Sequence, residues 1–319
     1  MTELKKRILP TVQKPARYIG GEWGEIKKDK QAVDVRVAFC FPDTYEIGMS
    51  NVGMRILYGV MNRMEGVWCE RVFAPWGDME AQMRKYALPL WALESQDPVR
   101  DFDMIAFTIV YEMSYSNIVN MLDLAGVPIH SRDRQELKNI VFAGGVCAFN
   151  PEPLADFIDF FSIGEGEEST REIVSLYQKA KKEGWRKDAF LWAVSKIQGV
   201  YVPGFYAPEY NADGTLRKLD VKEDAPPVVT KRIVENLDTA FFPTEMIVPS
   251  TRRLSMTGPI WKYSVAASGA AASARRALAA ALCAESTRRF CTVRRWRCWK
   301  TPGTTKLPFP ASLPRITVD

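Results

Sequence analysis

Cysteine and histidine are the residue types in this chain with the strongest metal-binding chemistry. The sequence has six cysteines and one histidine. The last three cysteines are Cys283, Cys291 and Cys298. Gaps of seven and six residues, with no histidine nearby, match a zinc or iron–sulfur site poorly. Cys40 and Cys147 lie in apolar, strand-like runs and are expected to be small buried hydrophobic residues. We therefore expect no metal site in the sequence as written.

Carboxylates and the histidine are the other candidates for chemistry. Glu165, Glu167 and Glu168 follow an apolar run and open a helical pattern, where acidic residues suit the helix dipole. A catalytic role for Glu165 or Glu167 is the alternative interpretation. His130 follows a helical pattern and is either a surface loop residue or a metal ligand.

The elements that would position these residues are strands and helices that alternate along the chain. Apolar runs predict strands over 35–41, 67–75, 103–110, 140–143 and 157–163. Helical periods predict helices over 54–64, 78–86, 117–125 and 165–182. Alternation of this kind predicts βαβ units and an α/β fold with a doubly wound, Rossmann-type parallel sheet. Ligands in such sheets bind beyond the carboxyl ends of the strands, which here lead into loops 43–53, 111–116 and 144–150.

The chain after residue 182 carries a smaller appendage. A helix is expected over 187–197, followed by a hairpin over 201–221 that turns at Asn211-Ala212-Asp213-Gly214. Pro226-Pro227 begins a linker. We divide the chain into an N-terminal extension (1–29), an α/β domain (30–185), a helix plus hairpin (186–225), a linker into a second domain (226–251) and a C-terminal tail (252–319).

The charge of the chain changes sign after Thr251. Residues 1–251 hold 30 Lys and Arg and 36 Asp and Glu, whereas residues 252–319 hold 13 Lys and Arg and only two acidic residues. The tail has no sustained period, and we expect it to be mostly irregular, with one Ala-rich helix near 266–284 at most. No apolar run approaches 18 residues, no secretory signal is visible and no disulfide framework is indicated. These features predict a cytoplasmic protein with no membrane partner.

The run Phe41-Pro42-Asp43-Thr44-Tyr45-Glu46-Ile47-Gly48-Met49-Ser50-Asn51-Val52-Gly53 resembles the N-terminal region of a bacterial radical S-adenosylmethionine (SAM) family. Members of this family carry a cobalamin-binding-like domain before the radical domain. Two later segments agree in order, Ile163–Glu167 and Phe242–Ser250, so the resemblance covers roughly the first 250 residues.

The resemblance points to a cofactor site whose key ligand is absent. Cobalamin-binding domains carry Asp-x-His-x-x-Gly after the first strand, where the histidine ligates cobalt. This chain has Asp43-x-Tyr45-x-x-Gly48, and a phenol is a poor ligand at neutral pH. Thr108 and Gly144-Gly145 correspond to the hydroxyl residue and the glycine pair of such domains. These residues are therefore the candidate cofactor-binding residues, for cobalamin or a nucleotide, and the alternative is that they are ordinary strand-end turns.

In this family a Cys-x-x-x-Cys-x-x-Cys loop should follow the linker. Its thiolates bind three irons of a [4Fe–4S] cluster. The resemblance implies that SAM chelates the fourth iron and is cleaved to a 5′-deoxyadenosyl radical. The motif is absent from this sequence. The resemblance thus implies an iron–sulfur enzyme whose present chain holds neither cluster nor SAM, has no catalytic residues of its own and is inactive.

Reading the tail in the neighbouring frame permits the missing motif. Each new codon takes the last base of one residue and the first two bases of the next. The codons ending in Ala267, Ala271 and Ala274 become NGC, which includes Cys, at Cys-x-x-x-Cys-x-x-Cys spacing. Trp261-Lys262 and Trp299-Lys300 each force Glu. We therefore interpret the tail as the product of a frame slip at about Thr251–Arg252.

Nucleic-acid binding is the competing interpretation of the tail. Residues 294–300 interleave arginines and a lysine with two tryptophans, which suits phosphate contact and base stacking. A G-rich gene read out of frame yields the same residues. We expect no specific nucleic-acid partner, and the sequence leaves the substrate of an intact relative open.

Overall fold

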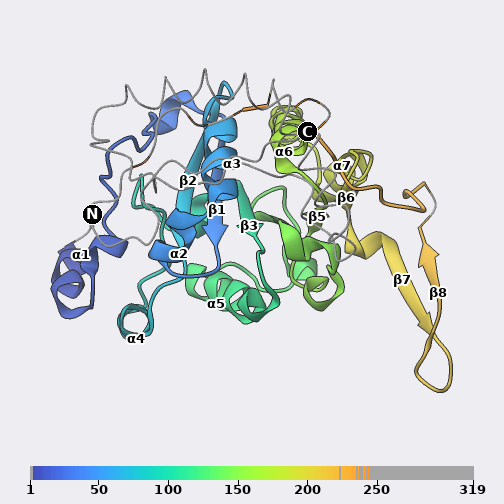
Figure 1. Cartoon of the computed structure of the whole chain (residues 1–319), viewed down its shortest axis with the longest axis horizontal. Helices are drawn as coiled ribbons and strands as arrows, with labels where there is room; N and C mark the ends of the chain where they lie inside the picture. Colours follow the sequence, from blue (N-terminus) through green and yellow to red (C-terminus); the bar gives the residue numbers. More distant parts are fainter. Residues whose placement is uncertain are drawn as a thin grey trace, which may run out of the picture.

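The computed structural model describes residues 3–222, 224–234, 236, 240, 241, 243 and 247. At its centre lies a six-stranded sheet in the order β2-β1-β3-β4-β5-β6 (Figure 1). Strands β1 to β5 are parallel, and β6 pairs antiparallel with β5. The strands are β1 (Val35–Phe41), β2 (Val67–Phe73), β3 (Met104–Thr108), β4 (Ile140–Gly144), β5 (Phe160–Ser162) and β6 (Val200–Tyr201).

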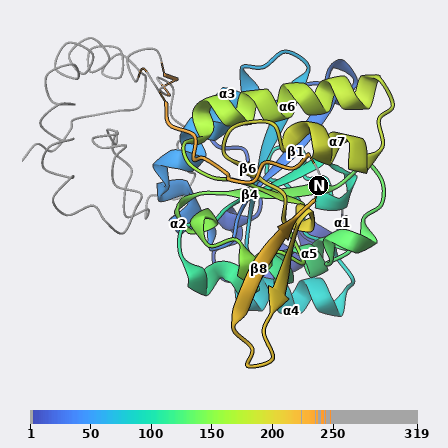
Figure 2. The ribbon, with the colours of Figure 1, turned by 90° about the vertical axis from the view of Figure 1, so that its right-hand side faces the viewer.

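Helices cover both faces of this sheet (Figure 2). Helices α4 (Gly77–Lys85) and α5 (Tyr115–Ala125) pack on one face. Helices α3 (Val52–Asn62), α6 (Gly166–Lys182) and α7 (Lys187–Val194) pack on the other. The predicted doubly wound α/β fold is therefore confirmed.

Alternate residues of each central strand feed two separate cores. In β1, Ala38 and Cys40 belong to the core under α4 and α5, whereas Val37 and Phe39 belong to the core under α3 and α6. A strand buried on both faces has no polar side to show. This is why the apolar runs predict the strands better than any alternation does.

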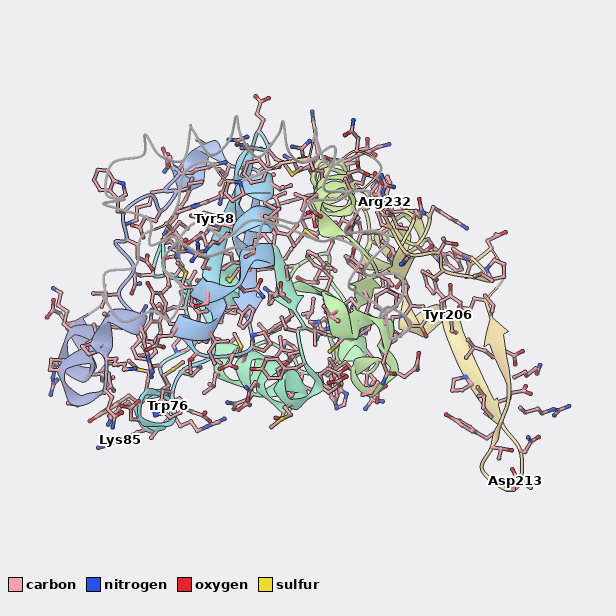
Figure 3. All side chains as sticks on the ribbon, viewed as in Figure 1. Tyr58, Trp76, Lys85, Tyr206, Asp213 and Arg232 are labelled. Atoms are coloured by element: carbon pink, nitrogen blue, oxygen red, sulfur yellow. The ribbon has the colours of Figure 1, made fainter. Side chains whose placement is uncertain are left out.

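The predicted helix and hairpin after the α/β unit are also present. Strands β7 (Tyr206–Tyr210) and β8 (Leu216–Val221) form a separate two-stranded sheet that extends away from the body. Asp213 lies at its tip (Figure 3). The Asn211 N–H donates to the Thr215 carbonyl at 2.8 Å, and Gly214 takes φ +82°, so the turn falls where the sequence predicts it.

Three local predictions were wrong. The loop expected over 43–53 contains helix α2 (Tyr45–Ser50), and the Asn51 side chain then accepts from the Met54 N–H to cap α3. Strand β5 has three residues rather than seven. Just before it, the Asp159 carboxylate accepts a hydrogen bond from the Val141 N–H at 2.7 Å, where a backbone carbonyl would accept it in a longer strand. Strand β6 was not foreseen, because two residues carry no period.

The residues before β1 are part of the core. Helix α1 (Glu3–Ile8) and the segment after it bury Leu9, Val12 and Tyr18 in the same core as α4. Within the described residues no helix has the length and apolarity that a membrane crossing requires. The expected irregular tail and its Ala-rich helix lie outside the described residues.

Candidate ligand site

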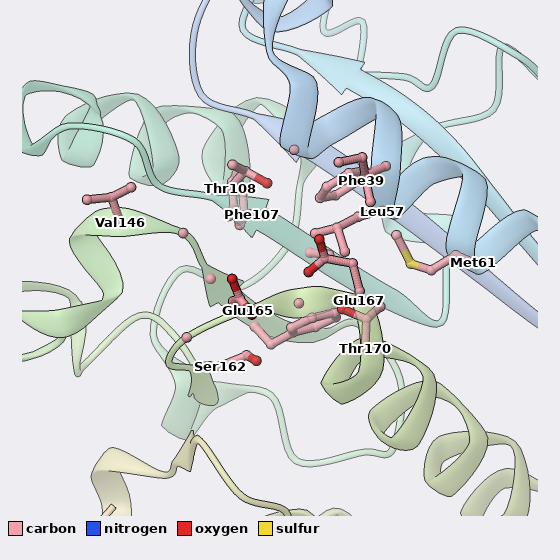
Figure 4. Close-up of a pocket in the computed structure, with 18 of the residues that line it drawn as sticks. Phe39, Leu57, Met61, Phe107, Thr108, Val146, Ser162, Glu165, Glu167 and Thr170 are labelled. Carbon is pink, nitrogen blue, oxygen red and sulfur yellow. The ribbon is translucent and has the colours of Figure 1, made fainter. Parts of the chain in front are cut away.

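A cavity of about 380 Å³ lies between α3 and α6, beyond the carboxyl ends of the central strands (Figure 4). Strands β1, β3, β4 and β5 all contribute to its floor. Its size falls within the range of about 300–1,000 Å³ that is typical of small-molecule sites. The sheet reverses its winding between β1 and β3, and ligands of doubly wound sheets bind at such a switch point. The cavity therefore occupies the expected ligand position of the fold.

The glycines of the cavity allow strand ends to approach closely. Gly145 adopts φ +106°, and a Cβ there would lie 2.5 Å from the Ile109 carbonyl oxygen. A Cβ on Gly144 would lie 3.3 Å from the Ser162 carbonyl oxygen. The backbone conformation and the close approach of Ile109 thus require glycine at position 145, whereas a side chain at position 144 would meet only a tight contact. Both glycines also line the cavity.

Helix α6 brings two carboxylates to the cavity. Glu165 precedes its first turn and Glu167 lies within it, and both side chains line the cavity (Figure 4). Glu165 Oε2 accepts from the Val234 N–H at 2.5 Å. Glu167 is only 8% exposed. Glu168 lies apart from them and pairs with Arg232 at 2.8 Å. Two of the acidic residues at this helix start therefore line the cavity, and the third forms an ion pair.

Backbone hydrogen bonds join the linker to the rim of the cavity. Arg232 forms a parallel bridge with Gly164: its N–H donates to the Ile163 carbonyl at 2.9 Å, and its carbonyl accepts from the Glu165 N–H at 3.0 Å. Arg232 lies beside α6 (Figure 3). Further on, the Phe241 ring packs 2.5 Å from the Cβ position of Gly59 on α3. The linker thus contacts both helices that bound the cavity.

Half of the candidate cofactor residues meet at this cavity. Thr108, Gly144 and Gly145 line it, whereas Asp43, Tyr45 and Gly48 do not. The Asp43 carboxylate instead accepts from the Thr44 N–H at 2.6 Å. Ligand binding by all six residues stays a prediction, but only the first three share a site.

Tyr45 points into the core and away from the cavity. It is 2% exposed, its hydroxyl donates to Glu22 Oε1 at 2.8 Å, and its ring lies edge-on to Phe73 at 5.3 Å. Burial and the neighbouring Glu22 raise the pKa of the Tyr45 phenol well above its ordinary value. A Cβ on Gly48 would lie 2.3 Å from the same Phe73 ring, so Gly48 serves helix packing here.

No group of three or more potential metal ligands occurs among the described residues. Cys40 and Cys69 are buried, and burial raises the pKa of both thiols. A protonated thiol is a poor metal ligand. His130 packs on Phe157 with ring centroids 5.2 Å apart. The described residues do not fit an iron–sulfur cluster, and the three C-terminal cysteines lie outside them.

The sequence did not indicate the α3 wall of the cavity. Leu57 and Met61 line it, but their helical period marks them equally well as core residues. The sequence marks Glu165 and Glu167 as candidates, but their position at the start of a helix explains their acidic character equally well. Contact of the linker with the cavity rim had no sequence signal.

Comparison with known proteins gives one family and one relative. Residues 53–203 match the family described as radical SAM proteins, N-terminal. An uncharacterized protein of Methanocaldococcus jannaschii is 27% identical over 151 residues, which are 46% of this chain and 28% of that protein. The chain thus matches less than a third of the relative's length. No solved structure matches the chain. The family match includes α3 from its second residue and the whole of α6, the two helices that bound the cavity.

Proposed function

We propose that this chain belongs to the radical SAM family, that it is a small-molecule-binding module of the kind that precedes a radical domain, and that it performs no radical chemistry itself. The observation that carries the proposal is the cavity at the switch point of the sheet, most of whose lining residues fall in the region that matches the family. Thr108, Gly144 and Gly145 are its proposed ligand-contacting residues.

The absence of radical chemistry follows from the ligand set. A [4Fe–4S] cluster with bound SAM supplies the radical in this family, and the cluster needs three thiolates. The sequence lacks the required cysteine spacing, and we propose that a frame slip near Thr251–Arg252 removed it. No radical step is assigned to residues of this chain.

Restoring the reading frame should restore the cluster. Two genes are compared after anaerobic treatment with ferrous iron and sulfide: the one that encodes this chain, and one with the frame corrected at codon 252. We expect the corrected protein to bind about four irons and to cleave SAM, and this chain to do neither. Genomic sequencing across codons 251 and 252 checks whether the slip is natural.

The matched control is the corrected protein with its three new cysteines changed to alanine, which should lose the cluster. If this chain itself acquires iron and sulfide in stoichiometric amounts and cleaves SAM, the proposal is refuted.

Cobalamin does not fit the described residues. The tyrosine that stands at the cobalt-ligand position is buried and donates to Glu22. The cavity, at about 380 Å³, is near the lower end of small-molecule sites, whereas a corrin with its nucleotide arm exceeds ordinary drug size. The module is therefore proposed to bind a smaller ligand.

Tyr45→His should not create a cobalamin site. The new imidazole would face Glu22 and Phe73 inside the core, and the lost hydroxyl contact should lower the free energy of unfolding by about 1–3 kcal/mol. Absorption titration with hydroxocobalamin, followed by desalting, measures binding. Tyr86→His, at a tyrosine that is 44% exposed, is the control. Cobalamin retained by Tyr45→His alone would contradict the assigned geometry.

A further inference from the structure

We infer that the cavity between α3 and α6 takes a phosphate-free heteroaromatic ligand of nucleoside size, whose hydroxyl or amino groups donate to Glu167 and Glu165. The inference rests on the proposed function, because it names the ligand class of the same cavity. Its three supports are the charge of the lining, the aromatic walls and the hydrogen-bonding capacity of the polar groups.

The charge of the lining disfavours an anionic ligand. Two carboxylates line the cavity, and no Lys, Arg or His lines it within the described part of the chain. In doubly wound folds a phosphate usually binds at a helix N-terminus, where N–H groups and the dipole attract it. Here the start of α6 carries Glu165, Glu167 and Glu168, which offset that dipole. A phosphate at this position would approach two like charges in a partly desolvated site.

The walls favour a flat, apolar body. Phenylalanine rings come from two strands and from the loop after β4, and α3 adds two apolar side chains. The wall residues are Phe39, Phe142, Phe149, Leu57 and Met61, whereas the Phe107 side chain belongs to the core on the other face of the sheet. Phe149 is 46% exposed, so one aromatic face is available at the cavity mouth. Aromatic rings pack favourably against such walls in stacked or edge-on arrangements.

The polar groups suit a ligand that donates hydrogen bonds. Ionised carboxylates only accept, whereas the hydroxyls of Thr108, Ser162 and Thr170 can do either. Acidic residues in dinucleotide-binding folds accept from ribose hydroxyls in this way. The bond from the Val234 N–H to Glu165 Oε2 orients one of the two carboxylates at the cavity. A neutral nucleoside supplies both the ring and the donors.

Adenosine and AMP provide a matched pair that differs by one phosphate. Calorimetric titration of the full chain should detect adenosine binding, and AMP should bind at least about tenfold more weakly because its phosphate faces the carboxylates. AMP binding that equals or exceeds adenosine binding would overturn the ligand class. Absence of adenosine binding at millimolar concentration would overturn it as well. Neither result affects the cluster experiment, which separately tests the radical-chemistry part of the proposed function.

Glu167→Gln tests the assigned carboxylate. Adenosine affinity should fall about tenfold, as expected for loss of a charged acceptor, and the preference for adenosine over AMP should narrow. A fold defect alone would weaken both ligands equally. Glu183→Gln, at the opposite end of α6, is the control and should leave both affinities unchanged. An unchanged adenosine-to-AMP ratio in Glu167→Gln would refute the role of this carboxylate.

Discussion

Arg71→Met is expected to lower the free energy of unfolding by about 3–5 kcal/mol, as measured by urea denaturation. Arg71 is 1% exposed, and it pairs with Glu94 at 2.6 Å and with Glu22 at 2.9 Å. Removal of the guanidinium leaves both carboxylates buried without their cation. The cost of an uncompensated buried charge exceeds the gain from a well-packed thioether.

The loss in Arg71→Met should grow with pH. Burial raises the pKa of Glu94 to about 7 even though Arg71 opposes the shift. Burial would also raise the pKa of Glu22, but the charge and hydrogen bonds of Arg71 hold it below its ordinary value. Without Arg71 both pKa values rise, so the folded variant binds more protons than its unfolded chain. Its stability therefore falls as pH increases above about 4.5, and the deficit relative to the parent should be larger at pH 8 than at pH 5.5.

Arg84→Met is the control for this experiment. Arg84 also contacts two carboxylates, Glu80 at 3.0 Å and Asp123 at 2.8 Å, but its side chain is 48% exposed. Exposed ion pairs contribute about 0–1 kcal/mol. Equal losses in the two variants would show that the buried network is not a major source of stability. A deficit in Arg71→Met that does not change with pH would contradict the pKa shifts assigned to Glu22 and Glu94.

The sequence predicts a helix or strand of this fold well where the element is long enough to show a clear hydrophobic pattern. Strand β1 is apolar at nearly every position and is bounded by Pro42, so its limits were predicted correctly. Helix α5 ends at Gly126, which has φ +68°, as the sequence indicated. Helix α2 and strand β6 have six and two residues, and neither is long enough to show a period. Their conformations depend on tertiary contacts.

The candidate site was predictable in position and only partly in detail. Thr108 and Gly144 end neighbouring strands and both line the cavity, because parallel strands end at one edge of the sheet. The motif spacing placed Tyr45 near the same edge, but α2 turns its side chain into the core. The buried ion pairs were even harder to predict from the sequence than the site. Arg71 lies in a strand, and its partners Glu22 and Glu94 are 49 and 23 residues away.

Gly164→Ala is expected to destabilise the protein and to release the linker. Gly164 adopts φ +112°, and a Cβ there would lie 2.1 Å from the Arg232 carbonyl oxygen, which is backbone and cannot rotate away. Backbone strain of about 1–3 kcal/mol adds to the loss of two backbone hydrogen bonds at about 1 kcal/mol each. The total is about 3–5 kcal/mol, to be measured by urea denaturation, and trypsin should cleave after Arg232 more rapidly.

Gly184→Ala separates the clash from the backbone conformation. Gly184 also has a positive φ, +67°, but a Cβ there would meet no atom within 4 Å. It should lose only about 1–2 kcal/mol and should leave cleavage after Arg232 unchanged. If both variants lose equal stability and protect Arg232 equally, the bridge to Gly164 does not hold the linker. If Gly164→Ala alone exposes Arg232, the loop that presents Glu165 to the cavity and the segment around Arg232 are held together by their backbone hydrogen bonds. A ligand that orders this loop would then also fix the start of the linker.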